Sequence, residues 1–75
     1  MNKQRRNDLR TVYAKIRDAK DDLASLTREE QMSLDAIPDN LQGSERAEKM
    51  EDAIDAMDNA TDALQEALSY LDEVV

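Results

Sequence analysis

The stretch AEKMEDAIDAMDNATDALQEALSYLDEVV, residues 47–75, decides the fold of this chain. Apolar or small residues recur in it at alternating steps of three and four positions. That spacing places side chains along one seam of a coiled coil. The members of this first stripe are Ala47, Met50, Ile54, Met57, Thr61, Leu64, Leu68, Leu71 and Val75. The stripe predicts a long amphipathic helix that packs along a partner helix.

A second stripe runs beside the first on the same expected helix, and most of its members are alanine. It consists of Ala53, Ala56, Ala60, Ala63, Ala67, Tyr70 and Val74. A helix with one neighbour needs one stripe, so two adjacent stripes predict contact on two sides. Alanine is also the best helix former, but helix propensity does not explain why the alanines collect on one side and the acids on the other. We interpret the second stripe as an oligomer interface.

The first half of the chain predicts another helix, over about residues 2–37. Its apolar residues keep the same spacing from Leu9 to Leu26, and the phase slips near Leu34. Such a slip is expected because a straight helix drifts relative to a seven-residue repeat. The run Thr27–Glu30 also matches a capping box, which would start a new helix. The absence of Gly and Pro nearby favours one continuous helix.

The two helices are separated by IPDNLQGS, residues 37–44. Pro38 cannot continue the backbone ladder, and Ser44 is a favourable N-cap for a second helix over about residues 44–73. The linker, residues 38–43, is too short for anything but antiparallel neighbours, so we expect an all-α helical hairpin. The expected hairpin core consists of Leu9, Val12, Ile16, Leu23, Leu26, Ile37, Leu41, Met50, Ile54, Met57, Leu64, Leu68 and Leu71.

The distribution of charge supports an antiparallel pair. Residues 1–20 contain seven bases and two acids, whereas residues 44–75 contain ten acids and two bases. Many weak ion pairs between the two helices would favour one register. A hairpin folded near residue 40 is expected to bring together Arg6 with Glu73, Arg10 with Asp72 or Ser69, and Arg17 with Asp62.

The junction IPDNLQGSERAE, residues 37–48, carries a resemblance to known proteins. It resembles the IP(D/E)NLQGSERxE junction of small uncharacterised helical-hairpin proteins from phages and prophages of Gram-positive bacteria. The flanking helices would match many coiled coils by composition alone, so the junction is the specific part. The resemblance implies a helical hairpin encoded by a mobile element, and it implies no activity.

The composition excludes most kinds of chemistry. The chain has 75 residues, a net charge of −8, and neither cysteine nor histidine. Di-iron bundles need histidine ligands, and the serines have no base to activate them, so we expect no catalytic residue, cofactor or metal site. No stretch approaches the length of a membrane span, and the N-terminus lacks the apolar core of a signal peptide. We expect one domain, located in the cytoplasm of a bacterial host cell.

The remaining charged and flexible residues each allow two interpretations. An acidic face on the second helix comprises Glu48, Glu51, Asp52, Asp55, Asp58, Asp62 and Glu66. It is either a solvated surface or an imitation of nucleic-acid phosphates that binds a host protein. The basic start of the chain lacks the interleaved aromatics and the motifs of nucleic-acid binding. Met50 and Met57 lie on the first stripe, which favours a core position over an adaptable groove.

Together these features predict a non-enzymatic helical hairpin that self-associates, most simply as a homodimer with four helices. Its activity would be binding of a protein partner from the phage or the host. The alternative is an acidic anti-defence or regulatory inhibitor of a host protein. Membrane association is not expected.

Overall fold

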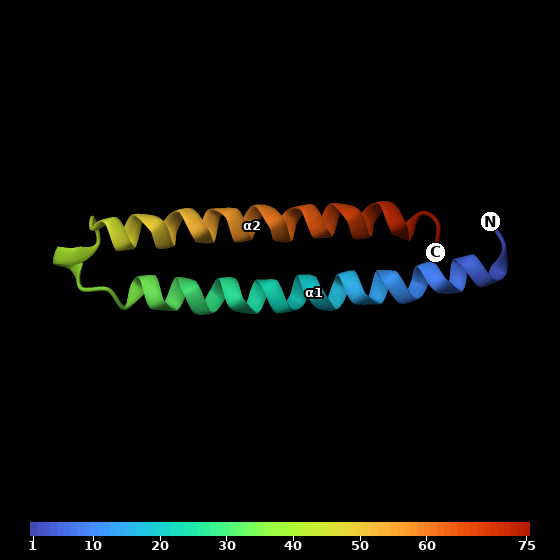
Figure 1. Ribbon diagram of the computed structural model, residues 1–75, viewed down its shortest axis with the longest axis horizontal. Helices are drawn as coiled ribbons and strands as arrows, with labels where there is room; N and C mark the ends of the chain where they lie inside the picture. Colours follow the sequence, from blue (N-terminus) through green and yellow to red (C-terminus); the bar gives the residue numbers. More distant parts are fainter.

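The computed structural model describes residues 1–75 and shows a hairpin of two long helices (Figure 1). Helix α1 spans Lys3–Asp35, a single 3-10 turn η1 spans Asp39–Leu41, and helix α2 spans Glu45–Asp72. The two helices lie side by side in an antiparallel pair that measures 60 × 15 × 13 Å. The predicted all-α helical hairpin is confirmed.

Both helices begin at side-chain caps. The Asn2 carboxamide oxygen accepts a hydrogen bond from the Arg5 amide at 2.7 Å, and the Ser44 hydroxyl accepts one from the Ala47 amide at 3.2 Å. Each cap satisfies an amide that has no partner within its own helix. Helix α1 continues unbroken through Thr27, whose hydroxyl donates to the Leu23 carbonyl at 2.8 Å and caps no new helix.

The connection between the helices is held by the side chain of Gln42. Its amide nitrogen donates to the Ile37 carbonyl at 2.6 Å and to the Leu34 carbonyl at 3.2 Å. The Leu34 carbonyl also accepts from the Ile37 amide at 3.1 Å, whereas Gln42 is the donor to the Ile37 carbonyl, which lies just beyond α1. The spacing of residues in the sequence gave no sign of this contact.

We expect Gln42→Ala to lower the free energy of unfolding by about 1 kcal/mol, because the Ile37 carbonyl loses its donor. Urea denaturation followed by circular dichroism, at one protein concentration, measures the change. Gln31→Ala is the control, since the Gln31 amide bonds only Asp35 within α1. Equal stability of the two variants would show that the hydrogen bonds of Gln42 do not stabilise the connection.

The seam between the helices follows a regular pattern on each side. On α2 every member of the first stripe, from Ala47 to Val75, is buried or half-buried. On α1 the covered positions advance by steps of four and three without interruption. The seam positions are Leu9, Tyr13, Ile16, Lys20, Leu23, Thr27, Glu30, Leu34 and Ile37, and Ala14 and Ala24 beside the seam are also half-buried. The expected slip of phase near Leu34 is therefore absent.

Three residues expected in the hairpin core lie outside it. Val12 is 44% exposed, Leu26 is 54% exposed and Leu41 is 49% exposed. Val12 and Leu26 each lie one position before a seam residue, Tyr13 and Thr27, and therefore point to the side of the pair. Leu41 belongs to η1, beyond the ends of both helices. The α1 seam is consequently more polar than the sequence pattern predicted.

The register of the helices also differs from the expectation. The Arg10 guanidinium donates to the Val75 carbonyl at 3.0 and 3.3 Å, and the Lys20 ammonium donates to the Gln65 carboxamide at 2.6 Å. Arg10 was expected beside Asp72 or Ser69, so α2 is displaced by several residues. The connection explains this shift, because α1 ends at Asp35 and the hairpin turns near residue 42 instead of residue 40.

The interhelical ion pairs expected from the charge distribution do not form. The two salt bridges of the structure, Arg17 with Asp18 at 3.8 Å and Lys49 with Glu45 at 3.2 Å, each lie within one helix. Arg6 lies beyond the end of α2 as a result of the register, so it has no neighbour at Glu73. Exposed ion pairs contribute little, and they do not set the register here.

Tyr13 reports the register through its ionisation. A hydrogen bond to the Asp72 carboxylate raises the pKa of the Tyr13 phenol above its ordinary value of 10.0. Partial burial and the negative charge of Asp72 raise this pKa further, whereas the positive charge of Arg17 lowers it. The folded chain thus holds this proton more tightly than the unfolded chain. The resulting stabilisation is present at neutral pH and is lost as the pH rises through the folded-state pKa.

Spectrophotometric titration of a Tyr70→Phe variant, in which Tyr13 is the sole tyrosine, should give a midpoint above 10.0. Adding Asp72→Asn should bring the midpoint back toward that value, because the negative charge is removed. Asp62→Asn removes the same charge far from Tyr13 and should leave the midpoint unchanged. A midpoint that responds equally to both changes would show that the register is wrong.

The buried core of the hairpin is small and lies near the connection. Five of the 75 residues are buried, and three of them, Leu34, Ala47 and Ile54, form one cluster. Ile37 and Met50 pack against this cluster. Toward the open end only Leu68, 2% exposed, is buried. A single copy of the chain therefore encloses little apolar surface.

Candidate interaction face

One long side of the hairpin carries an apolar face made by both helices, which we call the open face. It consists of Val12, Ala19 and Leu26 from α1 with Ala53, Ala56, Ala60, Ala63, Ala67, Tyr70 and Val74 from α2. On each helix a line of these residues immediately precedes seam residues. Two antiparallel helices are related by an approximate two-fold axis normal to the pair, so equivalent positions fall on the same side.

The contacts between the helices agree with this placement. The hydrogen bond between Lys20 and Gln65 and the contact of Tyr13 with Asp72 both lie on the other side of the pair. The open face is left without interhelical polar contacts. It is also the side on which Ala53 of α2 and Glu30 of α1 line a common groove.

Most of the open face is in contact with solvent. Ala53, Ala56, Ala60 and Ala63 are exposed and Ala67 is half-buried. Tyr70 is 66% exposed and Val74 is 43% exposed. With Val12 and Leu26, the face holds four of the seven large apolar side chains that the hairpin exposes. Such side chains are normal when they are scattered, but a contiguous face marks a surface that binds something.

The residues predicted to form the oligomer interface thus make up the α2 half of the open face, and the prediction did not include the α1 half. Val12 and Leu26 were assigned to the core, because their spacing from Leu9, Ile16 and Leu23 fits a seam equally well. The signal for their position was present in Leu34, which is out of phase with Leu26 and in phase with Thr27. Helix α1 therefore contributes Val12, Ala19 and Leu26 to the open face.

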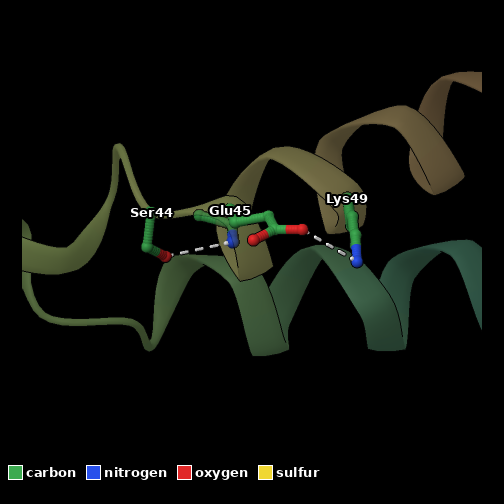
Figure 2. A network of polar contacts seen from close by, with 4 residues as sticks. Ser44, Glu45 and Lys49 are labelled. Carbon is green, nitrogen blue, oxygen red and sulfur yellow. Dashed lines mark hydrogen bonds and ion pairs between the residues drawn. The ribbon is translucent and has the colours of Figure 1, made fainter.

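A groove of about 510 Å³ opens at the end of this face that lies near the connection. Met50 and Ala53 supply its apolar lining, and its charged rim includes Arg46, Lys49 and Glu30. Figure 2 shows the same turn of α2, where the Lys49 ammonium lies 3.2 Å from the Glu45 carboxylate. The start of α2 is fixed by the Ser44 cap, so these side chains project from a rigid turn.

The acidic face covers the outer side of α2 and the flank of the pair opposite the open face. All of its members, from Glu48 to Glu66, are exposed, and none forms a salt bridge. No three potential metal-ligating side chains gather anywhere on the chain. The acidic face offers negative charge to a cationic partner, and it offers no preformed coordination geometry.

Neither long helix contains an apolar stretch that would span a bilayer. Comparison of the chain with protein-family models, with curated proteins and with solved structures finds no match.

Proposed function

We propose that this chain is a non-enzymatic protein-interaction module that self-associates through the open face, two hairpins forming a four-helix bundle. The observation that carries the proposal is the continuous apolar surface that neither helix of the same copy covers. The resemblance of residues 37–48 to hairpin proteins of phages supports an origin in a mobile element.

The surface area of the hairpin supports an interface of ordinary size. Its accessible surface is 5562 Å², whereas a compact monomer of this mass is expected to expose about 4,650 Å². The excess of about 900 Å² is close to the roughly 800 Å² per partner that a standard protein interface buries. The Cα radius of gyration is 17.3 Å, against about 11 Å for a compact domain of this length. Pairing two rods side by side reduces this excess.

The composition of the open face suits contact between helices. Alanines at Ala53, Ala56, Ala60 and Ala63 let two helix backbones approach closely, because the side chains between them are small. Association would also cover Val12 and Leu26, which the hairpin leaves in water. The acidic face lies on the opposite side of α2 and remains in solvent, where its charge keeps the assembly in solution.

Light scattering tests the self-association. At low micromolar concentration we expect the mass of two chains, each of 8.5 kDa. Ala63→Glu should raise the dissociation constant at least tenfold, about 1.4 kcal/mol, because the interface would bury an unpaired carboxylate. Asn59→Glu adds the same charge on the outer side of α2 and should leave the mass unchanged. A fully helical wild-type monomer at this concentration would contradict the proposal.

A second candidate function rests on the unpaired carboxylates of the acidic face. Such a surface can bind a basic host protein and inhibit it by imitating nucleic-acid phosphates. We expect capture of such a protein from bacterial lysate to weaken with rising salt. The variant D55N/D58N/D62N should abolish capture, whereas Q31A, which keeps every charge, should not. Capture that is unchanged by rising salt and by the D55N/D58N/D62N substitutions would count against inhibition through this face.

A further inference from the structure

We propose that the second copy lies on the open face with its connection at the opposite end, so that Tyr70 of each copy enters the groove of the other. This inference rests on the self-association proposed above and specifies its geometry. It identifies the occupant of the groove as a second copy of this chain.

The groove and Tyr70 are complementary in position and character. Tyr70 is the most exposed large side chain of the open face, at 66%, and it lies near the open end. The groove lies near the connection, at the other end of the same face, and presents Met50 and Ala53 to an incoming ring. A two-fold axis across the face exchanges the two ends, so both copies make the same contact.

Placing Tyr70 opposite Ala53 fixes the axis midway between them, near residues 61 and 62. Ala60 then meets Ala63 of the second copy, and Ala56 meets Ala67 of the second copy. The two contacts on each side of the axis join small residue to small residue. The two α2 helices can therefore approach closely along their centres, with a tyrosine ring filling the groove at each end.

Helix α1 provides an independent check of the same axis. The register of the hairpin places residues 23 and 24 of α1 beside residues 61 and 62 of α2, as the contact of Lys20 with Gln65 shows. An axis at this height sets Leu26 level with residue 21 of the second copy and Val12 level with residue 35. The nearest residues along the same line of the second copy are then Ala19 and Ser33, respectively. Each exposed large side chain thus meets a small one, although α1 was not used to position the axis.

The charges at the two ends are complementary in this arrangement. In the opposed arrangement Arg46 and Lys49 lie near Glu73 of the second copy. The first turns of α1, which extend beyond α2 (Figure 1), lie beside Asp39 of the second copy. Opposite charges therefore meet at both ends of the interface.

Cysteine cross-linking tests the orientation, because the chain has no cysteine of its own. Ala56→Cys and Ala67→Cys are prepared as separate variants, mixed, unfolded, refolded together and oxidised. The opposed arrangement places these two positions within disulfide range across the interface. We expect a mixed A56C–A67C disulfide, identified by mass spectrometry. Neither variant alone should cross-link, since each position lies about 16 Å along the helix from the same position in the second copy.

The matched control is a mixture of Ala19→Cys with Ala67→Cys. These positions face each other between copies only if both connections lie at the same end. A mixed A19C–A67C disulfide, or a dimer by light scattering that gives no A56C–A67C disulfide, would overturn the orientation and leave self-association intact. A monomer by light scattering would overturn the self-association itself.

Discussion

The packing of Leu34 against Ala47 and Ile54 beside the connection is the constraint on which the rest of the hairpin depends. It sets the rotation of α1 about its own axis at the point where the chain turns back. The Gln42 amide strengthens this end by binding the carbonyls of Leu34 and Ile37. A helix is stiff, so the rotation fixed at one end determines which residues face α2 along the whole of α1.

That rotation gives α1 a seam in which every second position from Tyr13 to Thr27 is polar or aromatic. Tyr13, Lys20 and Thr27 occupy the positions that Val12, Ala19 and Leu26 would have taken if α1 were turned by one residue. Thr27 satisfies its hydroxyl within its own helix, and Lys20 finds the Gln65 carboxamide. These polar side chains of the seam therefore have hydrogen-bond partners, but the more apolar line of α1 is left facing outward.

The outward line of α1 and the alanine stripe of α2 then become a single surface. Neither would amount to much alone, since a row of alanines is common in helices and single exposed leucines are ordinary. Their joint position on one side of the pair follows from the antiparallel arrangement. The self-association proposed for the chain is thus a consequence of how α1 is rotated, together with the small core that this rotation leaves in one copy.

The sequence by itself determined the two helices, the break at Pro38, the cap at Ser44 and the seam of α2, because these follow from local propensity and from a periodicity that allows one phase only. It did not determine the α1 seam. Leu9, Ile16 and Leu23 are common to two seams one residue apart, and charge could not separate them because exposed ion pairs are weak. Only the tertiary structure decided between the two, since the geometry of the connection fixes both the rotation and the register of α1, and with them the composition of the open face.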